Sequence, residues 1–583
     1  MNALKNKRPL IIFVSIMFAI VLTQCSPAYP RSTKPSSDWS RGLRVAADAI
    51  GTPSIIAADK GELIDIVWPL YATETQQTLH YMQLDETATP VSEHNLSFSF
   101  SQVRIPHILP ASDGKIHTFW ESRTVSGGKW TLWYGLLDPT GKLLSTPEAI
   151  SAPDIDMKSY HLAGDADGGV LVVWETNHGI FGTHLDSMGK MLSEPIQITT
   201  AGKNPFISAE NNNIFMAWWA ESGIRFQRFD TQFETSEGIL ISKPRLSGAD
   251  ELHGPVLETT DEWVYAAWSI RRQTGLEAGS AYTQFAAFPL GEPTLVEPNT
   301  IQILPTILET YAAYDGAYTL TQLVPPVSTP YSSEFVYNPV PALNSRGEFA
   351  LAITAKQEYH NQMVPQVVLT LFRDGQHIGY SQAVKTQLFS SSPALASDNA
   401  GNLHLAWREG YSGSEIYYAT TAAIARKNLD KLQIADFAQA ILAGLIEGLA
   451  SLVLAPLIGI MWMLPGFLIL VIYKLVRDLE SLDSWLSWGF LIATLILYQL
   501  LKWISFTPLI TYTPFSAWID IPAAWSMPLR VGGPALIFAC TILVAEWRRR
   551  SRSLSTVVYY LIVTIIDIAL TMLIYGVSFL GLS

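Results

Sequence analysis

The chain has 583 residues, a net charge of −13 and only two cysteines, Cys25 and Cys540. The acidic balance argues against a nucleic-acid partner, because phosphate backbones are bound by basic surfaces. The two cysteines lie in different parts of the chain, so neither part can hold an internal disulfide. The sequence contains no phosphate-binding loop, no HExxH motif and no Cys/His cluster, so we expect neither a cofactor nor a metal site.

The N-terminal segment 1–28 is typical of an export signal. Its cations precede an apolar run over residues 10–22, which is too short for a comfortable membrane span. Small residues place the expected cleavage after Ala28. The alternative is a bacterial lipoprotein signal with Cys25 acylated, in which Gln24 replaces the small residue that this signal prefers. Both interpretations export the rest of the chain.

A repeat of about fifty residues occupies residues 43–425, after a linker at 29–42. Each copy begins with apolar residues, usually after a proline, passes through a turn rich in Asp, Asn and Gly, and ends in alternating apolar residues. The copies that end in tryptophan are 53–68, 106–120, 160–174, 205–218, 255–268 and 393–407, and a seventh, 339–353, ends in Ile353. A second alternating run and a short edge strand follow, so each repeat predicts one four-stranded blade of an all-β propeller.

A split blade is expected to close the ring. The last copy stops after its third strand at 415–421, and the lone segment 42–50 can supply the fourth strand, which removes exposed sheet edges. Residues 305–335 leave an eighth, shortened blade open as an alternative. The tryptophans at the ends of the repeats are expected to pack between blades at equivalent sites, namely Trp68, Trp120, Trp174, Trp218, Trp268 and Trp407.

The loops that begin after these tryptophans are expected to gather on one face of the propeller. They carry Glu121, Arg123, Glu175, His178, Glu221, Arg271, Arg272, Arg408 and Glu409, and Arg104 is expected to reach the same face. One interpretation is a solvated loop face. The other is a ligand-binding face, because loops on a rigid scaffold commonly carry function. We expect the last strand to end on the opposite face, so that the charged face points away from the membrane.

Residues 436–583 are dominated by apolar side chains and follow a linker at 426–435. The apolar stretches are 436–473, 484–506, 531–546 and 556–578. The first could hold two spans, but one span preceded by an interfacial section places Lys474, Arg477 and the arginines between 548 and 552 in the cytoplasm, as the positive-inside rule favours. We therefore expect about four transmembrane helices in the bilayer and an extracytoplasmic propeller.

Asp567 lies in the middle of the last apolar stretch. A charge at this depth is costly and indicates function by default, whereas the alternative is a hydrogen bond between helices from a protonated acid. Neither inverted repeats nor a ladder of polar residues across the spans is expected to accompany it. Because of Asp567, transport or signalling through the helices is kept as an alternative function.

The repeat resembles the BNR, or Asp-box, propellers of the sialidase type over roughly residues 43–421. The closest passage is 103–123, VRIPHILPASDGKIHTFWESR, with an Arg-Ile-Pro motif, an apolar strand and a Glu-x-Arg ending. The resemblance implies that Arg104 matches the first arginine of the carboxylate-binding triad of that family. Three features depart from it: Val103 replaces an aromatic residue, no Asp-box is intact, and the general-acid Asp expected soon after Arg123 is absent.

A glycosidase needs a proton donor and a second group at a fixed distance. Because the donor is missing, the expected function is a non-catalytic, membrane-anchored propeller that binds an extracellular glycan or protein partner and acts as a scaffold. A sialidase-like exo-glycosidase is the alternative that belongs to the enzyme class. The ligand and the oligomeric state do not follow from the sequence.

Overall fold

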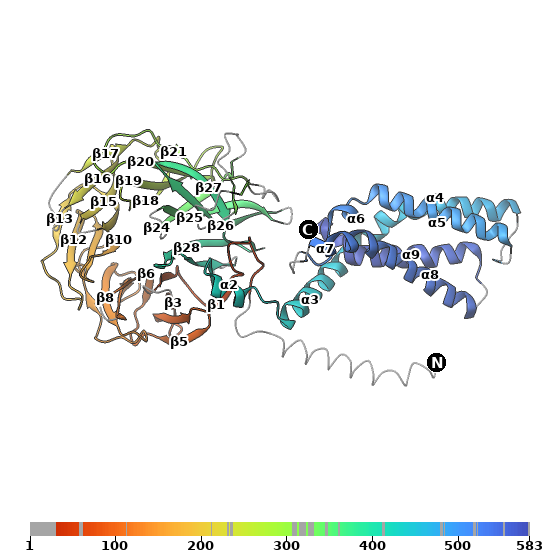
Figure 1. Ribbon diagram of the computed structural model, residues 1–583, viewed down its shortest axis with the longest axis horizontal. Coiled ribbons are helices and arrows are strands. Elements are labelled where there is room, and N and C mark those ends of the chain that lie inside the picture. Colours follow the sequence, from red (N-terminus) through yellow and green to blue (C-terminus); the bar gives the residue numbers. More distant parts are fainter. Residues whose placement is uncertain are drawn as a thin grey trace. The chain divides into compact units, whose positions relative to one another are not determined.

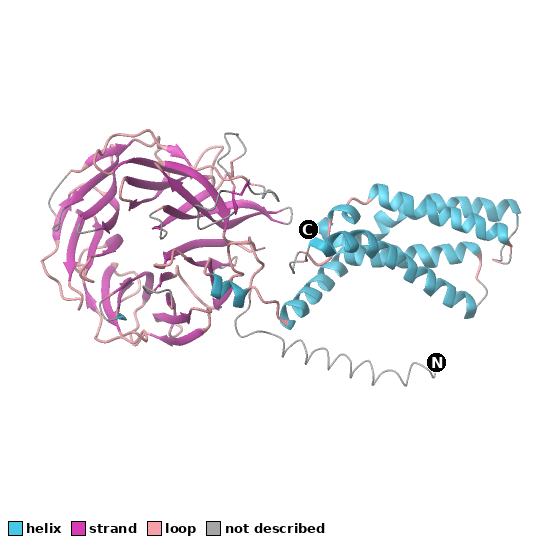
Figure 2. Ribbon diagram, viewed as in Figure 1, coloured by secondary structure: helices cyan, strands magenta, loops and turns pink. Residues whose placement is uncertain are grey.

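The computed structural model describes residues 31–580, except for 58–61, 112–113, 211–212, 230–232, 234–236, 306–311, 314–321, 325–331, 344–347, 360–361, 387, 411–413, 478–481, 483, 517–520, 522 and 552–553. These residues form two compact units, an all-β unit up to Lys431 and a helical unit from Leu432 onward (Figure 2). The segment predicted as an export signal, which includes Cys25, lies outside the described residues.

Six blades of the all-β unit consist of four consecutive antiparallel strands. They are β2–β5 (Ser54–Ala57, Leu63–Tyr71, Gln77–Asp85, Pro90–Asn95), β6–β9 (Gln102–Pro110, Ile116–Arg123, Thr131–Leu137, Glu148–Ala149), β10–β13 (Met157–Gly164, Val170–Thr176, Gly179–Leu185, Ile196–Thr199), β14–β17 (Lys203–Glu210, Asn213–Ala220, Gly223–Phe229, Ile239–Ser242), β18–β21 (Glu251–Thr259, Trp263–Arg271, Ala281–Pro289, Asn299–Thr300) and β24–β27 (Val336–Leu343, Phe349–Tyr359, Gln362–Arg373, Gln376–Gln382).

The seventh blade is split between the two ends of the propeller. It combines β28–β30 (Ser390–Ser397, Leu403–Glu409, Glu415–Thr420) with β1 (Leu43–Ala46), which pairs antiparallel with β30. The first strands of successive blades contact one another around the ring, and β28 contacts β2 (Figure 1). The predictions of seven blades and a split closing blade are confirmed.

The segment considered for an eighth blade forms no further four-stranded sheet among its described residues. Its described strands are β22 (Ala312–Ala313) and β23 (Gln322–Leu323), which pair only with each other as a two-stranded sheet. The single residue Val324 makes an isolated bridge to Tyr380 at the edge of the β24–β27 blade. The ring therefore has seven blades, and this segment is an insertion between two of them.

The repeat tryptophans lie on the second strands of their blades and are buried. Each is at most 3 % exposed, and Ile353 at the equivalent position of the β24–β27 blade is 0 % exposed. The hydrophobic clusters of the propeller combine side chains of neighbouring blades, as Phe119 and Val170 illustrate. A buried tryptophan removes about 150–250 Å² from water, so these side chains contribute strongly to the packing between blades. The expected packing role is confirmed.

The proline of the repeat marks a β-bulge in the first strand of the blade. In β6 the register shifts between Arg104 and His107, and Ile105, directly before Pro106, has a φ of 46°. A register shift and a left-handed residue before proline also occur at Asn204-Pro205, Gly254-Pro255, Asn338-Pro339 and Ser392-Pro393. Because a bulge re-aims the neighbouring side chains, the repeated proline determines how the first residues of each inner strand are presented.

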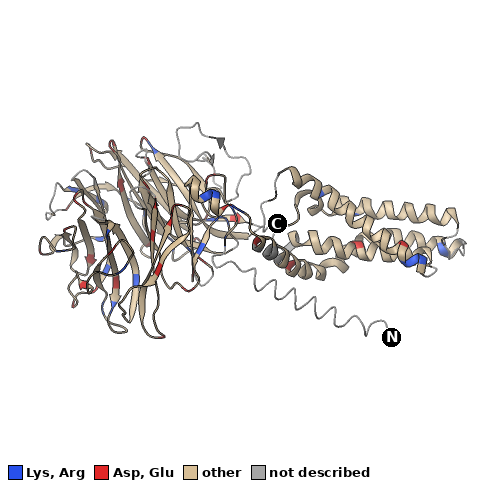
Figure 3. Ribbon diagram, turned by 60° about the horizontal axis from the view of Figure 1, so that its bottom comes forward, with Lys and Arg blue, Asp and Glu red and all other residues tan. Residues whose placement is uncertain are grey.

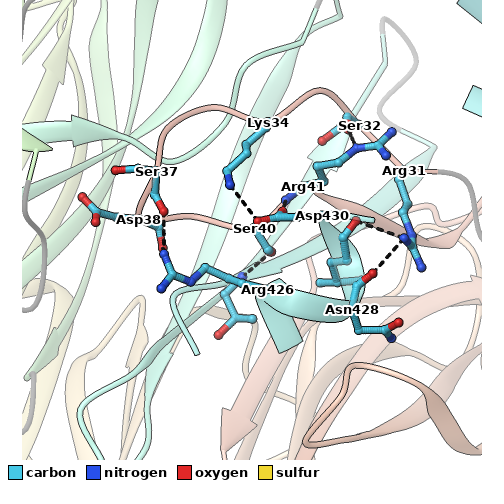
Figure 4. Close-up of polar contacts among 12 residues, drawn as sticks. Arg31, Ser32, Lys34, Ser37, Asp38, Ser40, Arg41, Arg426, Asn428 and Asp430 are labelled. Atoms are coloured by element: carbon cyan, nitrogen blue, oxygen red, sulfur yellow. Dashed lines mark hydrogen bonds and ion pairs between the residues drawn. The ribbon is translucent and has the colours of Figure 1, made fainter. Parts of the chain in front are cut away.

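The chain segment before β1 is fastened to the segment that leaves the propeller (Figure 4). Arg31 Nη1 donates to three backbone carbonyls at the C-terminal end of α2 (Ala423–Leu429) and just beyond it, each at 3.0 Å. Lys34 forms an ion pair of 2.7 Å with Asp430, which also accepts the backbone N–H of Arg41 at 3.0 Å. Segments expected to be linkers thus form a clamp that holds the two ends of the propeller together.

The helical unit contains five longer helices, α3 (Ile434–Ser451), α4 (Ala455–Arg477), α5 (Trp485–Ser505), α8 (Gly533–Ser551) and α9 (Thr556–Tyr575), with the short elements η2 (Leu452–Leu454), α6 (Pro508–Thr511), α7 (Ala523–Met527), η3 (Pro528–Gly532) and η4 (Gly576–Leu580). Within the described residues, four stretches are long and apolar enough to cross a membrane: Gly444–Val476, Trp485–Ser505, Ala524–Ser551 and Thr556–Ser578. Charged side chains are sparse along these helices (Figure 3). The number of these candidate spans equals the four that the sequence predicts.

Candidate functional site

The residues predicted for the binding face all lie at the same end of their blades, where the second strand finishes. The register pairs Gln102 with Arg123 and Glu251 with Arg271, which places the start of each first strand beside the end of the second. The expectation that these residues lie in loops is wrong for Arg104, Glu121, Arg123, Glu175, Arg271, Arg408 and Glu409, which lie in strands, whereas His178, Glu221 and Arg272 lie outside them. The reason is that the second strands continue for up to three residues beyond the tryptophan.

Three of these acids, Glu121, Glu175 and Glu409, are buried instead of being solvated, and two of them satisfy donors of the propeller interior. Glu175 is 4 % exposed, and its Oε2 accepts the hydroxyl of Ser159 at 3.1 Å and the backbone N–H of Asn204, in the next blade, at 2.8 Å. Glu409 is 3 % exposed, and its Oε2 accepts the indole N–H of Trp407 at 2.7 Å. These carboxyl groups satisfy buried donors, so packing accounts for their positions.

The cations of the β18–β21 blade are also paired. Arg272 Nη1 lies 2.5 Å from Asp250 Oδ2, and Arg271 Nη1 lies 3.7 Å from Glu251 Oε2. In contrast, the side chains of His178 and Glu221 are exposed in turns. The burial and the pairing of the ten predicted residues therefore differ from one blade to the next.

One group of them does converge, on the β6–β9 blade. Arg104 Nε donates to Glu121 Oε2 at 2.5 Å, and the Arg104 side chain is 38 % exposed while that of Glu121 is 0 % exposed. The guanidinium carbons of Arg104 and Arg123 lie 3.7 and 4.2 Å from the ring centre of Trp130, as cation–π contacts do. Trp130 is half-buried and was not predicted from the sequence. We call Arg104, Glu121, Arg123 and Trp130 the Arg104 cluster.

The bulge of β6 and the neighbouring blade hold the Arg104 cluster in place. The hydroxyl of Tyr160, on β10, donates to the carbonyl of Ile105 at 2.5 Å and to that of Phe119 at 3.1 Å. The backbone N–H of Trp130 donates to Asp156 Oδ1 at 2.8 Å. The bulge that orients Arg104 and the loop that carries Trp130 are therefore both anchored to residues that precede or lie on β10.

Burial raises the pKa of Glu121 to about 7, because the opposing pull of the Arg104 and Arg123 charges does not offset the loss of solvation and Asp156 adds repulsion. Glu121 Oε1, Ser122 Oγ and Arg123 Nε are buried and have no hydrogen-bond partner among the described residues. Unpaired buried polar atoms are costly, and most are paired in folded proteins. Packing alone therefore explains the Arg104 cluster poorly.

Asp567 in the helical unit has partners that were not predicted. Asp567 Oδ2 accepts hydrogen bonds from Lys502 Nζ and Tyr498 Oη, both at 2.6 Å and both from α5. Lys502 and Asp567 are each 0 % exposed. No group of three or more His, Cys, Asp or Glu residues that could hold a metal occurs in the described part of the chain.

The expectation that no ladder of polar residues accompanies Asp567 is wrong. Side chains that carry a hydroxyl or a charge and are at most 3 % exposed recur on α5 and α9, at Ser487, Thr494, Tyr498 and Lys502, and at Thr556, Tyr560, Thr564, Asp567, Thr571 and Tyr575, with Tyr559 beside Tyr560. On α9 they recur every three or four residues, which is the period of one helix face. This spacing is visible in the sequence and was the signal that could have revealed the ladder.

No protein-family profile matches the sequence. Over 93 residues the chain is 31% identical to the cytochrome b6-f complex iron-sulfur subunit of Parasynechococcus marenigrum (strain WH8102), a match that covers 15% of this chain and 48% of that protein. The match therefore spans about half the length of that relative and does not show a family. The sialidase-type assignment stays a prediction from the sequence.

Solved structures similar to the chain include an arabinase and a GH43_1 enzyme. An endo-arabinase from Bacteroides thetaiotaomicron VPI-5482 has a TM-score of 0.32 and 13% identity, with 60% of this chain and 99% of that chain covered. A GH43_1 enzyme from Xanthomonas citri complexed with xylotriose has a TM-score of 0.28, 11% identity and coverages of 48% and 97%. A protein of unknown function from Dyadobacter fermentans DSM 18053 has a TM-score of 0.33, 11% identity and coverages of 68% and 99%. At these scores the similarities carry no argument about function.

Proposed function

We propose that the protein is a membrane-anchored, extracytoplasmic propeller that binds a glycan or protein partner at the Arg104 cluster without catalysing a reaction. The observation that carries this proposal is the contact of two guanidinium groups with the half-buried ring of Trp130, one of which also pairs with the buried carboxyl of Glu121. Aromatic rings and arginines are the side chains that most often supply binding energy at recognition sites. The lipid bilayer is the second partner, through the four candidate spans.

The direction in which the chain leaves the propeller supports an outward-facing cluster. β30 begins at Glu415, which pairs with Glu409 at the end of β29, and it finishes at Thr420, which pairs with His404 near the start of β29. The chain therefore leaves on the face opposite the Arg104 cluster. The orientation of the Arg104-cluster face away from the membrane is part of the proposal, as the sequence predicts.

The geometry favours binding over glycoside hydrolysis. A general acid with a pKa near neutrality suits glycosidase chemistry, and Glu121 has such a pKa. Glu121 is, however, fully buried and paired with Arg104, so its carboxyl cannot approach the oxygen of a leaving group without breaking that pair. A fluorogenic sialoside assay separates the two functions: the enzyme alternative requires turnover by the wild type that Arg104→Ala abolishes, whereas the binding proposal requires background rates for both.

The proposal is tested with the full chain in lipid nanodiscs, screened against a panel of neutral and acidic glycans and against envelope proteins. Trp130→Ala removes the aromatic platform of the cluster and is expected to abolish retention of any ligand found. Arg228→Ala is the matched control, because Arg228 also lies over an aromatic ring, that of Phe215, but at the opposite end of its blade. Absence of any ligand, or equal loss in both variants, would contradict the proposal.

A further inference from the structure

Helix α9 is linked by side-chain hydrogen bonds to several earlier parts of the helical unit. The hydroxyl of Tyr560 donates to the carbonyl of Met463 on α4 at 2.9 Å, and that of Tyr575 donates to the carbonyl of Leu529 in η3 at 2.7 Å. The hydroxyl of Ser451, at the end of α3, donates to a backbone carbonyl of α9. Because α9 follows all these elements in the chain, each of them receives its partner only after α9 has been made.

The contact of α9 with α5 differs from these, because it involves two charges. Lys502 Nζ lies 2.6 Å from Asp567 Oδ2 and donates to Thr571 Oγ1 at 2.7 Å, while Tyr498 completes the group from α5. Both charged side chains are 0 % exposed. The group is thus an ion pair with two hydroxyl partners, enclosed between two apolar helices.

The direction of the Lys502 side chain is informative. Lys502 lies three residues before the end of α5 at Ser505, and a lysine near the end of a span ordinarily extends its long side chain toward water. Here the ammonium group instead reaches Asp567 and Thr571 inside the bundle. Asp567 lies in the middle of α9, and its short side chain cannot reach water from there. The lysine therefore supplies a counter-charge that the aspartate needs.

We propose that Lys502 and Asp567 form a charge lock that makes the stable packing of α5 and α9 interdependent, so that the bundle closes only when α9 is in place. Each charge alone is costly in a hydrocarbon environment, whereas the pair neutralises itself and is hydrogen-bonded by Tyr498 and Thr571. Nearer the N-terminal ends of the same helices, Trp488 and Tyr559 contact each other with ring centres 5.9 Å apart. The lock and this aromatic contact together are satisfied by one register of α5 against α9.

The lock makes a prediction about pairs of substitutions that packing alone does not make. Lys502→Met and Asp567→Leu each leave one buried charge without its partner, so each is expected to lower several-fold the fraction of full-length protein that stays monodisperse after heating in detergent. The double variant removes both charges and is expected to recover most of that loss. Recovery no better than that of Asp567→Leu alone would overturn the proposal.

Charge reversal tests the lock without removing the ion pair. Asp567→Lys places two ammonium groups together and is expected to lose the bundle, whereas the swap Lys502→Asp with Asp567→Lys restores opposite charges and is expected to regain monodisperse protein. Thr541→Val on α8 is the matched control, because Thr541 is 0 % exposed but donates within its own helix, to the carbonyl of Phe538 at 2.7 Å. A swap that behaves like Asp567→Lys, or a control as damaging as Lys502→Met, would contradict the lock.

Discussion

Arg104 and Glu121 join the surface of the propeller to its interior through one ion pair, with 2.5 Å between Nε and Oε2. Glu121 is fully buried, whereas the Arg104 side chain is 38 % exposed. An event at the exposed guanidinium, such as contact with an anionic or aromatic group, therefore changes the electrostatic environment of a buried carboxyl. Glu121 is therefore expected to influence both the pH dependence of propeller stability and the binding of a ligand at Arg104.

Two buried glutamates, Glu121 and Glu409, are expected to contribute less to the stability of the propeller as the pH rises. Burial raises the pKa of Glu121 and of Glu409 from 4.5 to about 7, so the folded state holds these protons more tightly than the unfolded state does. Their contribution to the free energy of unfolding is fully present below pH 4.5 and is lost as the pH rises through 7. Each contributes on the order of 1–3 kcal/mol.

The measurement for this prediction is the unfolding midpoint of the propeller between pH 5 and pH 8, with Glu121→Gln and Glu409→Gln as variants. Glutamine does not titrate, so each variant is expected to remove the part of the pH dependence that its glutamate contributes, and the double variant is expected to remove both parts. A pH profile for the double variant that coincides with that of the wild type would show that these carboxyl groups are not the cause.

Gly189 lies at a position where one added methyl group is expected to destabilise the propeller. Its φ is +82°, and a Cβ there would overlap the ring of Tyr134 in the preceding blade. Gly189→Ala is expected to destabilise the propeller by about 1–3 kcal/mol, because the backbone strain of a positive φ and the steric overlap with Tyr134 add. Gly248→Ala is the matched control, since nothing lies within 4 Å of its Cβ position and its φ is ordinary. Chemical denaturation of both variants measures the difference, and equal stabilities would refute the packing described here.

The clamp between the ends of the propeller is expected to stabilise the split blade. Asp430→Asn weakens both the ion pair with Lys34 and the hydrogen bond from the Arg41 backbone. A loss of about 1–3 kcal/mol is expected, as for a hydrogen-bonded charge, together with faster proteolysis before β1. Lys427→Ala, an exposed residue of α2, should leave both unchanged. Proteolysis rates that do not differ between the two variants would argue against the clamp.

Cysteine labelling tests the proposal that Glu221 and Arg550 lie on opposite sides of the membrane. In a Cys540→Ser background, a cysteine at Glu221 on the Arg104-cluster face is expected to react with an impermeant maleimide in intact cells. A cysteine at Arg550, whose side chain is 78 % exposed at the end of α8, is expected to react only after permeabilisation. Reaction of position 550 in intact cells would invert the proposed orientation.

The blade count and the split closure could be predicted because a proline, a turn and a tryptophan recur with one spacing, and each has a local physical role. The Arg104 cluster could be predicted only in part. Glu121 follows Trp120 directly, but the strand continues through it, so its burial depends on pairing with Arg104 from another strand. Trp130 lies in no repeat motif, and its partners come from elsewhere in the blade.

The same limit applies to Lys502. It lies within an apolar stretch that the sequence predicts as a span, yet its partner Asp567 is on a different helix. Local sequence patterns show which face of a helix is polar, but they do not show which two faces meet. The charged pairs Arg104–Glu121 and Lys502–Asp567 therefore join different strands or helices, and their geometry depends on the fold.

The most direct test of the central claim is the dissociation constant of a ligand found in the screen, measured for the wild type, Arg104→Ala and Arg228→Ala in nanodiscs. Binding at the Arg104 cluster predicts at least a tenfold weaker complex for Arg104→Ala, equivalent to about 1.4 kcal/mol, and an unchanged constant for Arg228→Ala. An unchanged constant for Arg104→Ala, or the same loss in both variants, would contradict the assignment of the binding site.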